Sequence, residues 1–126
     1  MGGGRSILLI EDDALTSEAF ALLLEEAGLS VVGPLGWLGD ATVAIDLTQI
    51  DAAVVDVNLH GVKCFSLMDE LDRAAIPFVI TTGYSSDVLP ERFKDRPFLE
   101  KPFADAQLLE LLNHILADKK TNRAAG

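Results

Sequence analysis

Short apolar runs, most of them ending in an acid or a hydroxyl, recur along this chain of 126 residues. Short runs without polar alternation are typical of strands that are buried on both faces, as in a parallel sheet. The predicted strands are Ser6–Ile10, Leu29–Leu35, Ala52–Asp56, Pro77–Thr82 and Pro97–Glu100. Because the segments between them have helical periodicity, we predict an α/β fold, a doubly wound parallel sheet with helices on both faces.

The first predicted helix, 14–28, has an apolar stripe that indicates its buried face. Asp13 is expected to cap the N-terminus, and Gly28 is a natural C-terminal stop. The stripe consists of Leu15, Ala19, Leu22 and Leu23, and Phe20, Leu24 and Ala27 widen it. We therefore expect this face of the helix to pack on the sheet.

Four further helices are predicted, and their sequence signals differ in strength. Regular apolar stripes indicate helices at 64–75 and 104–118, and Asp40 is expected to cap a weakly amphipathic helix that runs to Gln49. The span 83–96 leaves room only for a short helix, expected at Pro90–Lys94 because proline suits a first helical position. A regular repeat of strand and helix would have about three helical turns there.

Length and composition limit the classes of protein that this chain could be. With 49% hydrophobic and 24% charged residues, it has the composition of one globular domain. We expect that domain at 5–118, with flexible termini at 1–4 and 119–126. The net charge of −10 argues against direct binding of nucleic acid, and no apolar run is long enough to cross a membrane. A single cysteine and no apolar secretory-type N-terminus favour a cytoplasmic location.

Ionisable and hydroxyl groups follow four of the predicted strands. They are Glu11-Asp12-Asp13, Asp56, Thr81-Thr82-Gly83 and Glu100-Lys101-Pro102. In open α/β sheets, ligands bind outside the carboxyl ends of the strands, so these groups are expected to meet at one edge. Two carboxylates ~4 Å apart repel by about 4 kcal/mol at an effective dielectric near 20, and a cation is needed to offset this. Hard oxygen ligands of this kind suit Mg²⁺.

The same residues suit phosphoryl transfer. A carboxylate can attack a phosphoryl group and form an aspartyl phosphate. The transferring oxygens then need positive charge and hydrogen-bond donors, which Mg²⁺, Lys101 and the Thr82 hydroxyl can supply.

Four features, in order, give the chain a specific resemblance: Glu11-Asp12, Asp56 followed by Gly61, Thr82-Gly83, and Lys101-Pro102-Phe103. With these features the chain resembles the receiver domains of bacterial two-component response regulators over about 5–118. The resemblance implies a flavodoxin-like sheet of five parallel strands in the order 2-1-3-4-5. The short span between Thr82 and Lys101 resembles single-domain or hybrid-kinase receivers with a shortened fourth helix, which puts the usual output surface in doubt.

The resemblance also implies roles for single residues. Asp56 matches the phosphoacceptor, and Thr82, Lys101 and Phe98 match the residues that respond to the phosphoryl group. The implied Mg²⁺ ligands, for which Mn²⁺ or Ca²⁺ can substitute in crystals, are Glu11, Asp12, Asp56 and the main-chain carbonyl of Asn58. Asn58 and Tyr84 fall at the two positions that tune dephosphorylation in this family.

The implied function is that of a receiver in a phosphorelay. A sensor histidine kinase or a histidine phosphotransfer protein donates the phosphoryl group to Asp56, and the domain changes conformation to signal to a downstream protein. No turnover of a separate substrate is expected, and the chain is expected to be a monomer or a weak dimer. Direct contact with nucleic acid or membrane is not expected.

Two alternatives remain open at this stage. One is a pseudo-receiver, an interaction module that is never phosphorylated. The other is a Mg²⁺-dependent phosphohydrolase that forms an aspartyl phosphate. Such enzymes commonly carry a second acid two residues after the nucleophile, where this chain has Asn58, and this difference disfavours the enzyme.

Three residues near these motifs receive less specific predictions. Cys64 lies on an apolar stripe and is expected to be a buried structural thiol rather than a redox sensor. His60 is expected to be a solvated loop histidine. Trp37, between two glycines, is expected to be partly buried over the second helix.

Overall fold

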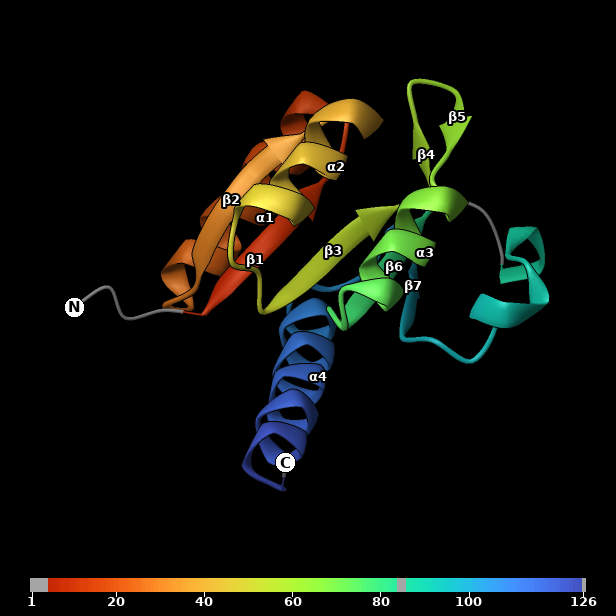
Figure 1. The fold of residues 1–126 in the computed structure, drawn as a ribbon. Helices are drawn as coiled ribbons and strands as arrows, with labels where there is room; N and C mark the ends of the chain where they lie inside the picture. The colour runs from red at the N-terminus through yellow and green to blue at the C-terminus, as the bar shows by residue number, and fades with distance from the viewer. Residues whose placement is uncertain (1–4, 84–85, 126) are drawn as a thin grey trace.

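A computed structural model describes residues 5–83 and 86–125 of the chain and has a central five-stranded sheet (Figure 1). The strands of this sheet are β1 (Ser6–Ile10), β2 (Ser30–Leu35), β3 (Ala52–Asp56), β6 (Phe78–Thr82) and β7 (Phe98–Glu100). All neighbouring strands are parallel, and their spatial order is β2-β1-β3-β6-β7. Once the short strands β4 and β5 are set aside, this is the predicted order 2-1-3-4-5, so the predicted fold class is confirmed.

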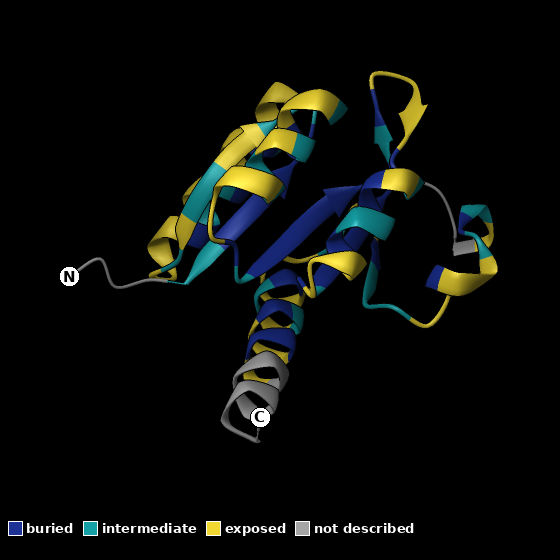
Figure 2. Ribbon diagram, in the orientation of Figure 1, coloured by how far each residue is buried: buried dark blue, intermediate teal, exposed yellow. Residues whose placement is uncertain are grey.

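Two buried clusters fill the space on the two faces of the sheet. On one face, α2 (Leu38–Leu47) and α3 (Phe65–Arg73) pack on alternate strand residues, among them Ile10, Val55 and Ile80. On the other face, α1 (Ala14–Glu26) and α4 (Asp105–Ala125) pack on Leu9, Val54 and Val79. The central strands are therefore buried on both sides, and exposed residues lie on the outer surfaces of the helices (Figure 2).

The buried face of α1 differs from the predicted stripe. Leu15 is 79% exposed and Leu22 is 57% exposed, whereas Ser17, Phe20 and Leu24 are buried. The prediction was right for Phe20 and Leu24 and wrong for Leu15 and Leu22. Apolar residues occupy so much of the circumference of this helix that periodicity alone cannot locate the centre of the buried face. Phe20 stacks on Phe103 with ring centroids 5.6 Å apart, and this contact helps to fix the face. The buried hydroxyl of Ser17 donates to the Ala14 carbonyl at 3.0 Å, which removes the cost of burying it.

The ends of two other helices also differ from prediction. Helix α2 begins at Leu38, because Leu38 packs against the core, and Asp40 lies inside the first turn rather than at the cap. A carboxylate there still favours the helix dipole. Helix α4 continues beyond the predicted end at Asp118 to Ala125. The added segment contains lysine, arginine and alanine, which are all strong helix formers.

The region of the shortened fourth helix contains two short 3-10 helices, Ser86–Val88 and Glu91–Phe93. Pro90, predicted to open a helix, takes the N-cap position of the second, with an extended ψ of 153°. Phe93 is fully buried and lies edge-on to Phe78. Two bidentate ion pairs, Arg92 with Asp69 and Arg96 with Asp72, join this region to α3 at 2.7–2.9 Å.

The predicted turn after β3 is a small hairpin. Strands β4 (Asn58–Leu59) and β5 (Val62–Lys63) pair antiparallel, with His60 and Gly61 as a two-residue turn. Both turn residues have positive φ, 49° and 83°, as a type I′ turn requires. In the described part of the chain, no helix is long and apolar enough to span a bilayer.

Candidate functional site

Three carboxylates meet at the carboxyl edge of the sheet. Glu11 and Asp12 directly follow β1, and Asp56 ends β3, the parallel neighbour of β1. One carboxylate oxygen from each residue lies within 4.8 Å of the others. Glu11 is 3% exposed and Asp56 is 6% exposed, so two of the three charges are held away from bulk water. The predicted gathering of acids at one edge is thus present.

Lys101, which follows β7, reaches two of these carboxylates. Its Nζ donates to Glu11 Oε1 at 2.8 Å and to Asp56 Oδ2 at 3.3 Å. Residues 11, 56 and 101 are far apart in sequence, and only the strand order brings them together. The lysine therefore balances part of the charge that the buried acids carry.

Burial shifts the ionisation of this cluster. Burial, with a further contribution from the neighbouring Asp56 charge, raises the pKa of Glu11 to about 7, although the Lys101 hydrogen bond opposes the shift. For Lys101, burial lowers the pKa, but the hydrogen bond to Glu11 and the charge of Asp56 outweigh it and leave the pKa above its usual value. The site thus holds a permanently charged lysine beside an acid that titrates near neutrality.

Two backbone amides near the cluster fix the orientation of the acids. The Asn58 N–H donates to Asp56 Oδ1 at 3.2 Å, and the Asp13 N–H donates to Glu11 Oε2 at 3.1 Å. Asp13 itself caps α1 as predicted, since its Oδ2 accepts from the Thr16 N–H at 2.8 Å. These bonds hold Glu11 and Asp56 in place before any ligand binds.

The donor set fits a hard divalent cation. Three carboxylates supply oxygen atoms at short mutual distances, and the side chain of the adjacent Asn58 holds a buried Oδ1 for which the described residues offer no hydrogen-bond donor. Mg²⁺ binds carboxylate and carbonyl oxygens and keeps several waters. The residues that would hold it are Glu11, Asp12 and Asp56, and the Asn58 main-chain carbonyl remains a predicted ligand.

Of the three predicted switch residues, Thr82 and Phe98 lie on the opposite side of the strand ends from Lys101. By strand alternation, Thr82 and Phe98 face the α2/α3 side, where Phe98 packs against the buried cluster. Thr81 shares the α1/α4 face with Asp56, its Cα partner in the β3–β6 register. Thr82 is buried and the Lys101 N–H donates to its carbonyl at 2.7 Å. Tyr84 lies outside the described residues.

Comparison with known proteins decides the family. The response regulator receiver domain family matches residues 7–113. The chain belongs to this family.

The receiver domain is similar to two curated transcriptional regulatory proteins. It is 30% identical over 109 residues to the transcriptional regulatory protein PdtaR of Mycobacterium tuberculosis, a match that covers 83% of this chain and 53% of PdtaR. It is 34% identical over 108 residues to the transcriptional regulatory protein FixJ of Azorhizobium caulinodans, covering 80% of this chain and 50% of FixJ. The receiver domain thus spans about half the length of these curated relatives.

One solved structure is similar over nearly its whole length. The solution structure of SdrG from Sphingomonas melonis Fr1 superposes with a TM-score of 0.79 at 35% identity, covering 90% of this chain and 97% of SdrG. A BeF₃-activated conformation of SdrG matches with a TM-score of 0.77 at the same identity, covering 92% of this chain and 99% of that one.

The receiver domain also holds a contact that sequence reasoning missed. The His60 N–H, in the β4–β5 turn, donates to Asp12 Oδ2 at 2.7 Å, and the His60 ring stacks on Trp37. His60 is exposed in a turn, as expected, but the sequence did not predict its contacts with Asp12 and Trp37. Trp37 is 59% exposed, which agrees with the expected partial burial, and its ring lies on His60. The signal available in the sequence was His60-Gly61 between the apolar residues Leu59 and Val62, because glycine readily adopts the positive φ that a two-residue hairpin turn needs.

Cys64 is fully buried at the start of α3, as predicted. Burial, followed by the nearby charges of Asp56 and Asp12, raises the pKa of its thiol to about 12. The thiol therefore stays protonated near neutrality, which is typical of a structural cysteine.

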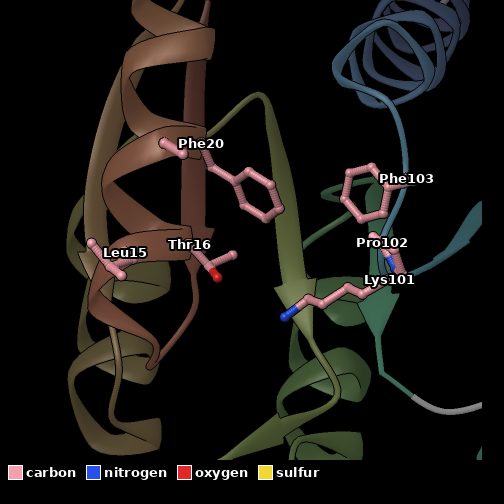
Figure 3. A pocket seen from close by; sticks show the side chains of 7 residues that line it. Leu15, Thr16, Phe20, Lys101, Pro102 and Phe103 are labelled. Carbon is pink, nitrogen blue, oxygen red and sulfur yellow. The ribbon is translucent and has the colours of Figure 1, made fainter.

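An apolar groove adjoins the acid cluster. It lies between α1 and the loop that follows β7, and its volume is about 370 Å³. Leu15, Thr16 and Phe20 line one side, and Lys101, Pro102 and Phe103 line the other (Figure 3). Because Lys101 belongs both to the groove and to the acid cluster, an occupant of the groove would lie next to Asp56.

Proposed function

We propose that this receiver domain accepts a phosphoryl group on Asp56 in a Mg²⁺-dependent reaction and acts as a cytoplasmic relay. The observation that carries the proposal is the buried cluster of Glu11, Asp12 and Asp56, joined to Lys101 at the carboxyl edge of the sheet. The donor we propose is a sensor histidine kinase or a histidine phosphotransfer protein, and the receiver of the signal is a separate protein.

The chemistry follows from the positions of these groups. An Asp56 carboxylate oxygen forms a bond to phosphorus while the bond from phosphorus to the donor's histidine nitrogen breaks, and that nitrogen leaves with the electron pair. Lys101 donates to the transferred oxygens, and the Asn58 N–H keeps the other Asp56 oxygen oriented. A bound Mg²⁺ supplies charge that offsets the carboxylates and the phosphoryl oxygens. Glu11 and Asp12 hold their oxygens in position for that cation.

Conversion of Asp56 to an acyl phosphate would change the charge at the strand ends by nearly one unit. Lys101 is then drawn from Glu11 toward the phosphoryl oxygens, and Thr82 is the hydroxyl proposed to follow. Phe98 packs on the same sheet face as Thr82, so movement of Thr82 can alter how Phe98 packs. The existence of a BeF₃-activated conformation of SdrG, at 35% identity, supports a two-state response of this kind.

The apolar groove beside Lys101 supports a protein donor. Leu15 lines the groove and is 79% exposed, and Pro102 and Phe103 continue the apolar surface beside Lys101. Contiguous exposed apolar surface marks contact sites for other proteins. A helix that presents a phosphorylated histidine is the occupant we propose, because the groove continues into the acid cluster through Lys101.

The test is the mass of the intact protein after incubation with acetyl phosphate. We expect one phosphoryl adduct that requires Mg²⁺, is absent with chelator, and is absent in Asp56→Asn. The matched control is Asp46→Asn, which makes the same chemical change at an exposed position of α2 and should leave the adduct unchanged.

If wild-type protein shows no adduct, phosphate release is measured next. If phosphate is released rapidly, with many turnovers of a phosphate ester, and the release depends on Asp56, the phosphohydrolase replaces the relay. The absence of both adduct and release would replace it with the pseudo-receiver.

A further inference from the structure

The β4–β5 hairpin folds back onto the strand end that carries Asp12. The His60 N–H donates to Asp12 Oδ2 at 2.7 Å, across 48 positions of sequence. The His60 ring nitrogen Nδ1 lies 3.9 Å from the same oxygen. One oxygen of the Asp12 carboxylate is therefore held by the hairpin.

A second contact fixes the hairpin from the other side. The rings of Trp37 and His60 stack with centroids 3.7 Å apart and planes inclined by 11°. Trp37 lies in the loop between β2 and α2, so three loops meet here: the ends of β1 and β2 and the turn of the hairpin. The two nearly parallel rings are in direct contact, which joins the hairpin turn to the loop between β2 and α2.

The backbone around the stack is closely fitted. A Cβ added to Gly36 would lie 3.3 Å from Asp12 Cα and 3.4 Å from His60 Nε2, so the glycine allows Asp12 and His60 to approach. His60 has a φ of 49°, in the left-handed region that costs energy for most residues. The positive φ of His60, the close approach at Gly36 and the Trp37 ring therefore all lie around one contact, the hydrogen bond from the His60 N–H to Asp12.

We propose that Trp37 and His60 are positioning residues for the cation site. Their stack keeps the hairpin closed, so that the His60 N–H orients Asp12 and the Asn58 N–H remains on Asp56. Groups that orient metal ligands typically change metal affinity by roughly 10- to 100-fold when they are removed. This inference rests on the proposed function only in that it assigns Glu11, Asp12 and Asp56 to a divalent cation.

The variants follow from the geometry. Trp37→Ala removes the stack, and Trp37→Phe retains an aromatic ring. His60→Asn removes the imidazole but tolerates positive φ, so the turn can still form. Val62→Ala is the matched control, because Val62 lies on the same hairpin, is 51% exposed and takes no part in the stack.

The measurement is titration calorimetry with MgCl₂ on the full chain. We expect Trp37→Ala and His60→Asn to bind Mg²⁺ at least about fivefold more weakly, toward the range for lost orienting groups. Trp37→Phe and Val62→Ala should remain near the wild-type affinity. Thermal unfolding in chelator verifies that all variants are folded, and equal Mg²⁺ affinities in folded variants overturn the proposal.

A spectroscopic signal separates positioning from general stability. Trp37 is the only tryptophan in the chain, so its fluorescence reports on the stack alone. We expect the Trp37 fluorescence of wild type to change saturably as Mg²⁺ is added. In Asp12→Asn and His60→Asn we expect no such fluorescence change at saturating Mg²⁺. No change in wild type at saturation overturns the proposal.

The two proposals fail in different ways. If wild type binds Mg²⁺ and the stack variants weaken it, but acetyl phosphate gives no adduct and no release, the relay fails and the positioning role stands. If the variants bind Mg²⁺ as wild type does while Asp56 is phosphorylated, the positioning role fails and the relay stands. Wild type that binds no Mg²⁺ overturns both.

Discussion

Two sets of ion pairs between basic and acidic side chains have similar distances but differ in burial, and the difference in burial changes their electrostatic effect. Lys101 meets Glu11 and Asp56 where the acids are almost fully buried, with Glu11 Oε1 2.8 Å away. Arg96 meets Asp72 at a similar 2.7 Å, but their side chains are 32% and 39% exposed. In the buried set, burial raises the pKa of Glu11 to about 7 even though the Lys101 hydrogen bond opposes that shift. The exposed set joins the short 3-10 region to α3, and solvent screens most of its energy.

The largest expected effect comes from removing the buried cation. Lys101→Met leaves Glu11 and Asp56 together without their ammonium partner, and we expect a loss of about 3 kcal/mol in the free energy of unfolding at pH 7.5. Urea unfolding in chelator measures this. Because Mg²⁺ can replace the missing charge, 10 mM MgCl₂ (roughly physiological in order of magnitude) should restore part of the loss. Unchanged stability in chelator would contradict the buried pair.

The pH dependence of stability tests the acid of the same set. Glu11 has its pKa raised to about 7 in the folded state from 4.5, so the folded state holds the proton more tightly. The contribution of protonated Glu11 to the free energy of unfolding is therefore complete below about pH 4.5 and is lost as the pH rises through about 7. Without Mg²⁺, we expect stability to fall by on the order of 2 kcal/mol between pH 5 and 7.5.

Glu11→Gln is the control for this pH effect, because it cannot titrate and should remove most of the slope. Lys101, with its pKa raised above 10.5, does not titrate in this window. The pKa of Asp69, lowered by its hydrogen bond to Arg92, also lies outside the window. A wild-type slope that persists in Glu11→Gln would assign the titration to another group.

The contrast between the two regions also explains what the sequence could predict. The buried strands and the acids at their ends were predictable, because a parallel sheet brings all carboxyl ends to one edge. Glu11, Asp56 and Lys101 follow from that rule once the strands are located. The short 3-10 region was predictable as a short span, but not its attachment through Arg96, which depends on where α3 lies.

The features that were missed depend on packing rather than on local pattern. The phase of α1 is set by Phe20 against Phe103, a contact across 83 positions of sequence by residue number. The stack of Trp37 on His60 likewise joins two loops whose relative position only the folded sheet decides. Loops carry such contacts without a periodic signature, which is why a lone tryptophan between glycines could not be placed.

A buried group without a partner gives a third, smaller test. Thr81 is fully buried on the same sheet face as Asp56, and its Oγ1 has no hydrogen-bond partner among the described residues. Thr81→Val keeps the shape and removes the hydroxyl, so we expect stability to rise by about 1 kcal/mol. Thr81→Ser, which keeps the hydroxyl and loses a methyl group, should be less stable than wild type. A destabilised Thr81→Val would indicate that the hydroxyl has a partner after all, such as a bound water.

The smallest effect is expected for the exposed pair. In a double-mutant cycle of Arg96→Met and Asp72→Asn, we expect a coupling energy of about 0.5 kcal/mol, since solvent screens both charges. Arg96→Met alone should cost more than the coupling energy, because the guanidinium also lies 5.4 Å from the ring centroids of Phe78 and Phe93. At about 1 M NaCl the coupling should nearly vanish, whereas the cost of Lys101→Met should remain, because salt screens exposed charges far more than buried ones. If both effects fell equally with salt, burial would not be what distinguishes the two sets of ion pairs.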